Sequence, residues 1–274
     1  MTKHDNIFDK NILFNYGLIV NKVESAFVQT VWNYYAVNRR EMPWRADTRG
    51  YYVLLSEIML QQTQVTRVIE LFTKFIERFP DFETLASADL GEVLRCWQGL
   101  GYNRRAKFLH ETAKIIVEKY NGVVPKSVEV VDDLPGIGQA TAAAIVTYTY
   151  NISTPFIETN IRRVYLHHFF VDQLDISDGQ LLLIIEKTWS CDNPREWGWA
   201  LMDYGSYLAK IIPNPNRNSR HYTKQSKFVG SIRQMRGVIL KKMLEQGKNA
   251  DWGDLALDSR FAKAYQDLKS EKLI

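Results

Sequence analysis

The sequence has 274 residues, of which 46% are hydrophobic, and a formal net charge of +4, so it can bury a core in one domain or in two closely associated ones. Its start lacks the basic-then-apolar pattern of a secretory signal, and no apolar stretch approaches the roughly 20 residues that span a bilayer, so we expect an intracellular, cytoplasmic protein without a membrane partner. Its two cysteines, Cys96 and Cys191, form no Cys-x-x-Cys pair, which excludes a disulfide framework and a four-thiolate metal site, and we expect both to be buried.

Apolar residues recur at helical spacing along most of the chain. A first helix is predicted around residues 27–35, ending before Met42 and Pro43. The segment 85–97 ends in Gly99-Leu100-Gly101, which is typical of a helix terminus. Strand-like alternation is scarce, so the sequence predicts an all-α fold. The other predicted helices are 52–72, 105–120, 140–148, 161–170, 180–189 and 197–209.

A turn-rich linker at 211–216 interrupts this pattern. Two more helices are predicted after it, 237–246 and 261–268, so residues from about 223 form a small helical or winged-helix-like appendage. The stretch 217–242 contains basic but no acidic residues. A phosphate backbone would favour such a stretch, although a solvated surface segment balanced by acidic residues elsewhere has the same composition. Its basic residues are Arg217, Arg220, Lys224, Lys227, Arg233, Arg236, Lys241 and Lys242.

The segment Leu-Pro-Gly-Ile-Gly at 134–138 joins two predicted helices. Its glycines let the backbone approach an anion closely, and the N–H groups at the start of the next helix are suited to bind one. One hypothesis is therefore a site for a phosphate, and the other is a tight turn that serves packing alone. The residues predicted to contact the phosphate are Leu134, Gly136, Gly138, Gln139, Ala140 and Thr141.

This segment, followed some twenty residues later by an acidic residue that opens a helix, Glu158, is similar to the signature of helix-hairpin-helix (HhH-GPD) DNA glycosylases. Four further blocks resemble the MutY adenine glycosylases in order and spacing. They are Met-Pro-Trp-Arg at 42–45, Leu-Ser-Glu-Ile-Met-Leu-Gln-Gln-Thr-Gln-Val at 55–65, Trp-Gln-Gly-Leu-Gly-Tyr at 97–102 and Ala-Leu-Met-Asp-Tyr-Gly at 200–205. The resemblance covers about residues 25–210 and implies a two-lobed helical core over 1–222, with an inner lobe of about 50–160 and the appendage at 223–274.

The resemblance implies that a flipped base is cut from its sugar. Glu57 would donate a proton to the base, because its apolar helix favours the neutral acid; the alternative is a glutamate on the solvent face of that helix. Glu158 would stabilise the cationic sugar, or attack it, in place of the family's aspartate, from which it differs by one methylene, a reach of about 1.5 Å. It could otherwise be only a helix cap. Asn160 would hydrogen-bond within the site.

Other residues are implied to recognise the base and enter the duplex. Arg45 would help to hold the base. Gln61 and Gln62 follow Glu57 by four and five residues, so we expect them on nearly the same helical face, where one would fill the space of the extruded base. Surface amides are the alternative. Tyr102 borders the DNA or merely packs, and Trp44 is either a core residue or a stacking platform.

Two departures from the family refine the prediction. Enzymes of this superfamily that also cleave the strand have a lysine where this chain has Ala140, so we expect a monofunctional glycosylase without efficient lyase activity. Most relatives hold an iron-sulfur cluster with four cysteines after the Met-Asp-x-Gly block, and this chain has none after Asp203, so no cofactor is expected. His167 and His168 point about 100° apart on a helix, which argues against a metal site.

Three functions stay open. The first is excision of adenine opposite guanine or 8-oxoguanine, although the family's domain that senses 8-oxoguanine is too large for the last fifty or so residues. The second is excision of thymine or uracil from mismatches, and the third is DNA binding without catalysis. We expect double-stranded DNA with a mismatched or damaged base as the partner, a cytoplasmic, nucleoid-associated location and a monomeric protein.

Overall fold

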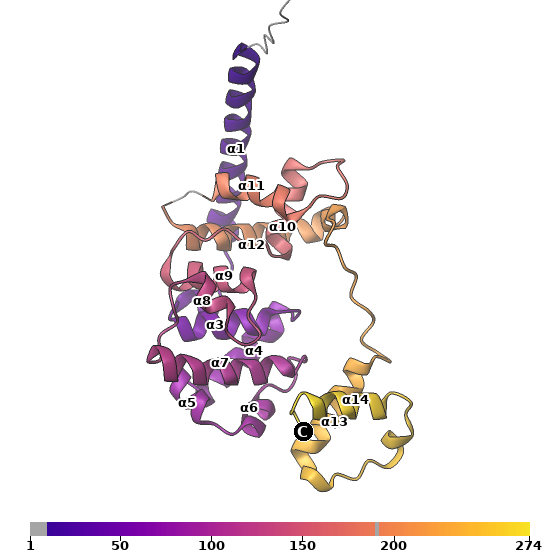
Figure 1. Ribbon diagram of the computed structural model, residues 1–274. Helices are drawn as coiled ribbons and strands as arrows, with labels where there is room; N and C mark the ends of the chain where they lie inside the picture. Colours follow the sequence, from indigo (N-terminus) through magenta and orange to yellow (C-terminus); the bar gives the residue numbers. More distant parts are fainter. Residues whose placement is uncertain (1–9, 190–191) are drawn as a thin grey trace, which may run out of the picture. The chain divides into compact units, whose positions relative to one another are not determined.

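A computed structural model describes residues 10–189 and 192–274 of the chain, so the expectation for Cys191 lies outside the described residues. Within them the elements are helices (Figure 1). The only extended pairing among the described residues is an isolated bridge between Ile176 and Ser219. The predicted all-α fold is confirmed. No helix in these ranges has the length and apolar character needed to cross a membrane.

The chain divides into two compact units, and each is built from two separate stretches. Unit 1 comprises residues up to Arg40 together with Pro155–Tyr222. In it α1 and α10 both pack against α12, and Phe27, Tyr165 and Trp197 form an aromatic core. Its helices are α1 (Lys10–Asn38), α10 (Thr159–Phe169), α11 (Asp178–Thr188), α12 (Pro194–Ile211) and the 3-10 turn η1 (Pro215–Asn218).

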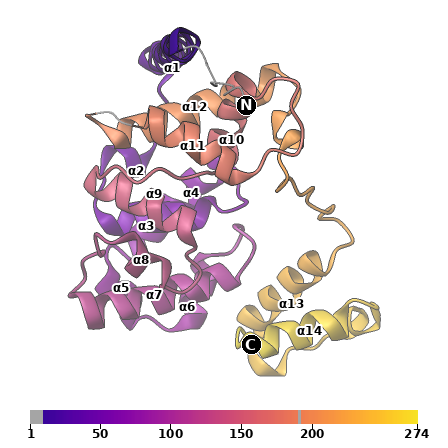
Figure 2. The same cartoon turned by 45° about the horizontal axis from the view of Figure 1, so that its top comes forward.

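Unit 2 comprises Glu41–Thr154 and Thr223–Ile274. Its central helix is α3, whose buried residues include Leu54, Leu55 and Ile58, and which packs against α4, α7 and α9 (Figure 2). The helices of the first stretch are α2 (Pro43–Ala46), α3 (Gly50–Leu60), α4 (Val65–Arg78), α5 (Phe82–Ser87), α6 (Leu90–Cys96), α7 (Arg104–Tyr120), α8 (Val128–Asp132) and α9 (Gln139–Tyr150). Cys96 is only partly buried.

The last stretch of the chain is helical and belongs to unit 2. It contains α13 (Ile232–Gln246), the 3-10 turns η2 (Gly247–Asn249) and η3 (Gly253–Leu257), and α14 (Phe261–Ser270). The described part contains no strand, so of the two predicted forms the structure has the helical one. Its helices pack on each other, and α13 also packs against α6. Residues 223–274 and residues 41–154 thus belong to one compact unit.

Two predicted helices are each divided in the structure. The helix predicted at 52–72 ends at Leu60 and resumes at Val65, and Gln62 between them has a left-handed φ of 56°. The helix predicted at 85–97 is broken at Ala88, because the Asp89 carboxylate accepts from the N–H of Gly91 at 2.8 Å and starts α6. In both cases the apolar spacing runs on across the break, which explains why periodicity did not reveal it.

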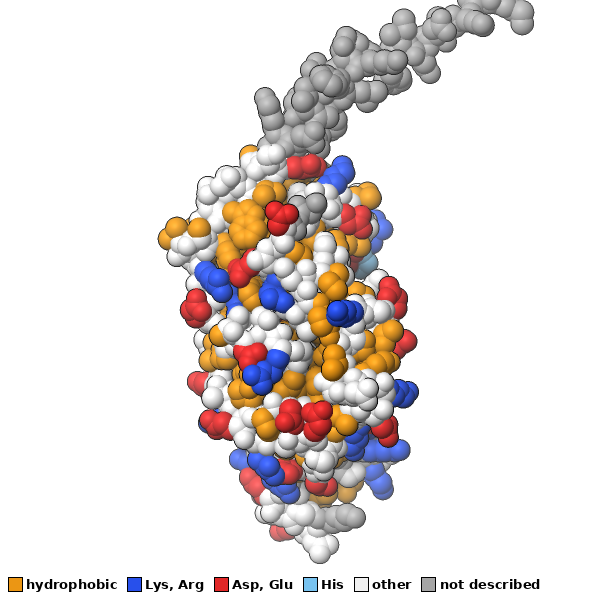
Figure 3. All heavy atoms as spheres, turned by 90° about the vertical axis from the view of Figure 1, so that its left-hand side faces the viewer, with side chains coloured by type: hydrophobic (Ala, Val, Ile, Leu, Met, Phe, Trp, Pro, Cys, Tyr) orange, Lys and Arg blue, Asp and Glu red, His pale blue; other side chains and the backbone are white. Residues whose placement is uncertain are grey.

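Charge is mixed on the face of the molecule drawn in Figure 3. Acidic and basic side chains are interspersed there, with apolar side chains between them. A face of this kind gives a polyanion no field of one sign to bind.

Candidate functional site

The hairpin between α8 and α9 holds two glycines in different situations. Gly136 has a φ of +75°, and a Cβ there would lie 2.6 Å from the ring of Phe108, so the fold itself requires a glycine. Gly138 is extended, and a Cβ there would meet nothing within 4 Å. Packing within the protein therefore does not explain why position 138 is a glycine.

The first turn of α9 can receive an anion. Gly138 is its N-cap, no side chain caps the helix, and Gln139 and Ala140 are exposed while Thr141 is half-buried. Leu134 is different, because only 4% of it is exposed and its side chain belongs to the core. Its main chain alone remains for a phosphate contact.

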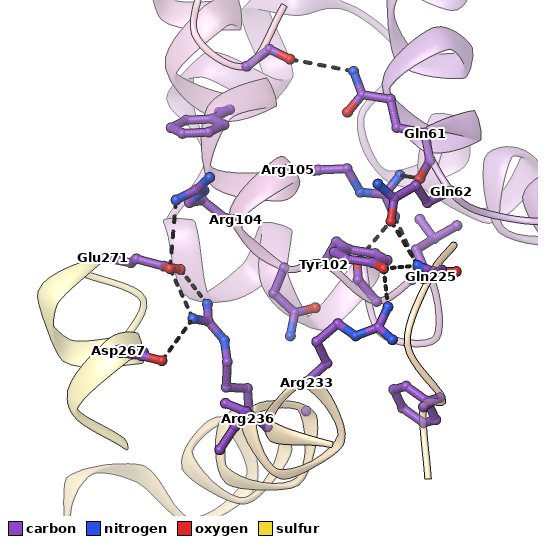
Figure 4. A pocket seen from close by; sticks show the side chains of 18 of the residues that line it. Gln61, Gln62, Tyr102, Arg104, Arg105, Gln225, Arg233, Arg236, Asp267 and Glu271 are labelled. Carbon is purple, nitrogen blue, oxygen red and sulfur yellow. Dashed lines mark hydrogen bonds and ion pairs between the residues drawn. The ribbon is translucent and has the colours of Figure 1, made fainter. Parts of the chain in front are cut away.

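Gln61 and Gln62 do not lie on the helical face that the sequence predicts for them. Because α3 ends at Leu60, both stand in the following turn, and their side chains diverge. The amide of Gln61 donates to the carbonyl of Gly136 at 3.4 Å, whereas the amide oxygen of Gln62 accepts from Gln225 at 2.9 Å (Figure 4). Gln61 thus joins the turn to the hairpin, and Gln62 joins it to the C-terminal stretch.

Arg105 on α7 holds this turn and the one at 99–102 from inside the protein. One guanidinium nitrogen donates to the carbonyls of Ile58, Met59 and Gln61 at 2.7, 3.0 and 2.7 Å, which satisfies the open C-terminal end of α3. The other donates to Thr63 Oγ1 at 3.0 Å and to the carbonyls of Leu100 and Gly101 at 3.1 and 3.2 Å. Burial lowers the pKa of Arg105 to about 10, so the group is still charged at neutral pH.

Tyr102 lies beside Arg105 in a cavity of about 950 Å³ within unit 2. It has a left-handed φ of 47° and is 37% exposed. Its hydroxyl accepts hydrogen bonds from Gln225 and Arg233, and the Arg233 guanidinium lies 5.5 Å from the ring centroid. Figure 4 shows these side chains converging from the 99–102 turn and from the C-terminal stretch.

Glu57, the predicted proton donor, and Arg45, predicted to help hold the base, are both at least partly withdrawn from solvent. Glu57 is partly buried and stands between Ser56 and Ile58, which are buried. The side chain of Glu57 is therefore not fully exposed to solvent. Arg45 on α2 is only 6% exposed, and Trp44 next to it packs edge-on against Phe72 with centroids 5.2 Å apart, which makes Trp44 a core residue.

Glu158 is the N-cap of α10 in unit 1. One carboxylate oxygen accepts from the backbone N–H groups of Asn160 and Ile161 at 2.5 and 2.7 Å. Burial raises the pKa of Glu158 above its usual range, while these N–H groups and the nearby charges of Arg163 and Arg162 act in the opposite direction. Burial therefore favours the neutral acid at Glu158, and the two N–H groups and the two arginines favour the carboxylate.

The start of α10 is held by three further side-chain contacts. Arg163 donates to Asn160 Oδ1 at 2.7 Å and to the carbonyl of Gly205 at 3.0 Å. A Cβ on Gly205 would lie 2.4 Å from the carbonyl oxygen of Asn160, so only glycine permits this approach. Asn216, which is 5% exposed, donates to the carbonyl of Thr159 at 3.0 Å. Helix α12, through Gly205, and the 3-10 turn after it, through Asn216, therefore support the residues around Glu158.

The two histidines have structural surroundings. His168 shares a hydrogen bond of 3.0 Å with the Tyr204 hydroxyl, and its burial, aided by the charge of His167, lowers its pKa to about 4. Among the described residues, no group of histidine, cysteine, aspartate and glutamate has the arrangement of a metal site.

Sequence reasoning missed the residues that hold the two turns and α10 in place. Arg105, Asn216, Gln225 and Arg233 act mainly on carbonyls or on residues far away in the chain, so no local motif marks them. The only available signal was the uniformly basic stretch that contains Arg233.

Known proteins that are similar to this chain belong to the family that its motifs resemble. The family model described as "HhH-GPD superfamily base excision DNA repair protein" matches residues 55–191. The adenine DNA glycosylase of Buchnera aphidicola subsp. Baizongia pistaciae is 36% identical over 197 residues, which are 70% of this chain and 55% of that protein. That of Mycolicibacterium smegmatis is 46% identical over 133 residues, 48% of this chain and 45% of that one. The chain spans about half the length of these curated relatives.

Solved structures agree on the fold. A thermostable thymine-DNA glycosylase aligns with a TM-score of 0.65 and 26% identity, covering 72% of this chain and 92% of that one. An endonuclease III trapped as a covalent intermediate with DNA aligns with a TM-score of 0.53 and 18% identity, over 67% of this chain and 83% of that chain, which concerns the fold alone. The chain therefore belongs to the HhH-GPD superfamily of base excision DNA repair proteins.

Proposed function

We propose that this protein is a monofunctional DNA glycosylase that hydrolyses the N-glycosidic bond of a flipped adenine opposite guanine or 8-oxoguanine. The observation that supports the proposal best is the similarity to an adenine DNA glycosylase, 36% identity over 197 residues, which are 70% of this chain. The protein would act on double-stranded DNA as a monomer, in the cytoplasm at the nucleoid.

In this proposal the two acids have separate tasks. Glu57 donates a proton to the adenine, which improves the leaving group, and the Glu158 carboxylate stabilises the positive charge that develops on the sugar. Water then adds at C1′ as the C1′–N bond breaks and gives up one proton, which restores the neutral Glu57 acid, so the products are free adenine and an abasic site. Asn160 keeps the Glu158 carboxylate in place by sharing its backbone N–H and, at 3.4 Å, its amide with it.

The hairpin and the turn at 61–62 would bind the DNA. The exposed first turn of α9, with the open space at Gly138, is suited to a backbone phosphate. Gln62 and Tyr102 would fill the gap left by the flipped base, and Arg45 would help to hold that base. Gln61 is assigned a supporting position, because its amide is bound to the hairpin.

The proposed reaction uses neither a lysine nucleophile nor an iron-sulfur cluster. Ala140 offers no amine for a Schiff base, so we expect no product that borohydride traps on DNA. The four cysteines of an iron-sulfur cluster cannot be supplied by a chain that contains two, so purified protein should lack an absorption band near 400 nm, and no step of the reaction runs through such a cluster.

The specific alternative is excision of thymine or uracil opposite guanine. It is favoured by one observation, the alignment with a thymine-DNA glycosylase over 92% of that chain's length. DNA binding without catalysis is the remaining hypothesis, because Glu158 replaces the family's aspartate.

The test is base release from a panel of duplexes with each mismatch and common lesion, scored as abasic sites by alkaline cleavage. We expect release from adenine opposite guanine or 8-oxoguanine, and its loss in Glu57→Gln and Glu158→Gln with DNA affinity largely kept. Glu77→Gln, an equivalent change at an exposed glutamate of α4, is the matched control and should act like the wild type. Release of thymine or uracil alone would favour the alternative, and no release from any duplex would favour DNA binding without catalysis.

A further inference from the structure

Two side chains of the C-terminal stretch are bound to the residues assigned to the space of the flipped base. Gln225 donates from one amide nitrogen to the Gln62 amide oxygen, at 2.9 Å, and to the Tyr102 hydroxyl. Arg233 donates to the same hydroxyl, and its second terminal nitrogen is fixed by the carbonyl of Ser226 at 2.7 Å. We call Gln62 and Tyr102 the wedge, and Gln225 with Arg233 the tether (Figure 4).

Both wedge residues have a backbone conformation that side chains disfavour. The φ angles of Gln62 and Tyr102 are 56° and 47°, in the left-handed region. For residues other than glycine this region is unfavourable by roughly 1 kcal/mol or more each, so it persists only where contacts hold it. Arg105 provides such contacts to the carbonyls of the two turns, and the tether provides them to the side chains.

The tether leaves the wedge accessible. A cavity of about 950 Å³ opens beside Gln62, Tyr102, Gln225 and Arg233, and Tyr102 remains 37% exposed while its hydroxyl is bound. If the tether covered the wedge, it would fill this space. The tether contacts instead fix the two wedge side chains at the wall of an open cavity.

We propose that Gln225 and Arg233 are positioning residues that preorganise the wedge for insertion into DNA, an inference that rests on the proposed function. The tether orders Gln62 and Tyr102 in the free protein, so less order has to be gained when the base is flipped. The tether affects the step in which the wedge enters the DNA. The first encounter with DNA depends on phosphate contacts and is largely independent of the tether.

The test uses full-length protein and a duplex with 2-aminopurine in place of the target adenine, whose fluorescence rises when it leaves the stack. Gln225→Met removes the amide donor at similar size without adding charge, and Tyr102→Phe removes the hydroxyl but keeps the ring. Losing these hydrogen bonds should lower the flipping equilibrium roughly five- to tenfold, with affinity for undamaged duplex nearly unchanged. Arg233→Ala should have the same effect, and Arg233→Lys should recover part of the signal. The control Lys263→Ala, at an exposed position of α14, should have no effect.

A double-mutant cycle separates positioning from general structure. The hydrogen bond from Arg233 to the Tyr102 hydroxyl is lost in either single variant. The double variant Tyr102→Phe with Arg233→Ala should therefore flip the base no less than whichever single variant flips it less. In the free protein, amide hydrogen exchange at residues 61–63 and 99–104 should speed up in each tether variant, while the melting temperature stays close to that of the wild type.

Three results would overturn the inference: additive losses in the cycle, unchanged flipping in every variant, or increased flipping, which would mean that the C-terminal stretch restrains the wedge. Wild-type protein that neither flips nor releases a base removes the proposed function, and the positioning role falls with it. Wild-type release of adenine combined with unaffected tether variants removes the positioning role alone.

Discussion

Gly136 and Gly138 lie two residues apart in one hairpin and differ in what they do. Gly136→Ala should destabilise the protein by about 1–3 kcal/mol, because it strains a left-handed residue and presses on Phe108. Gly138→Ala should fold normally, since its methyl group meets nothing in the protein, but should weaken binding to duplex DNA. Urea unfolding and DNA titration separate the two effects, and equal DNA affinity in Gly138→Ala and wild type would contradict the phosphate site.

Glu158 should make the protein less stable as the pH rises. Its pKa in the folded state lies above its ordinary value of 4.5 in the unfolded chain, so the unfolded chain loses its proton first. The stability that the neutral acid contributes is complete below pH 4.5 and is lost as the pH rises above it towards the folded-state pKa. Glu158→Gln keeps an oxygen for the cap but does not ionise. Its urea midpoint, relative to the wild type, should therefore be higher at pH 7 than at pH 4. An equal difference at both pH values would contradict this.

His168 should destabilise unit 1 in acid. Its pKa is about 4 in the folded protein against 6.5 in the unfolded chain, so the stability present above pH 6.5 is lost as the pH falls from 6.5 towards 4. In His168→Gln this part of the pH dependence should disappear. Urea midpoints of both proteins across that range measure it, and parallel curves would show that other groups are responsible.

At the scale of single residues, the sequence pointed to candidate site residues only where they belong to a recognisable motif. Glu57, Glu158, Asn160 and the hairpin glycines could be picked out because the family's blocks mark them. Arg105 could not, because its partners are mostly main-chain carbonyls, which every residue has. The roles of the predicted site residues stay predictions.

At the scale of elements, one arginine connects three of them. Arg105 on α7 binds the end of α3 and the turn at 99–102 through six hydrogen bonds, and losing a buried charged donor of this kind should destabilise the protein by about 3 kcal/mol or more. Arg105→Ala should therefore melt well below the wild type. Arg105→Lys should lie between them, because an ammonium cannot serve both turns at once. A melting temperature of Arg105→Ala within a degree or two of wild type would contradict this.

Element types could be predicted from the sequence more readily than their ends. The expected helices at 105–120 and 140–148 correspond closely to α7 and α9, because apolar spacing reports the buried face of a helix. The break after Leu60 could not be seen, since α4 continues that spacing with Val68 and Phe72. What ends α3 there is Arg105, which lies more than forty residues further along the chain.

At the scale of the whole molecule, DNA binding should depend steeply on salt. Arg220 and Arg236 of the basic stretch are paired with Asp175 and Glu271, whereas Lys224 and Lys227 are exposed and form no ion pair with a described residue. Replacing both lysines with alanine should lower the slope of log K against log salt by about 2, since each phosphate contact contributes roughly 0.9. Lys263→Ala is the control. An unchanged slope would mean that these lysines are only a solvated surface.

The composition of the two units sets the order in which a newly made chain can finish folding. The chain passes from one unit to the other after Arg40, Thr154 and Tyr222, so each unit contains an early and a late portion. During synthesis, unit 1 has to wait for residues 155–222 and unit 2 for residues 223–274. The turns that carry Gln62 and Tyr102 emerge from the ribosome long before Gln225 and Arg233. The side chains assigned to enter DNA therefore acquire their final hydrogen bonds among the last steps of biogenesis.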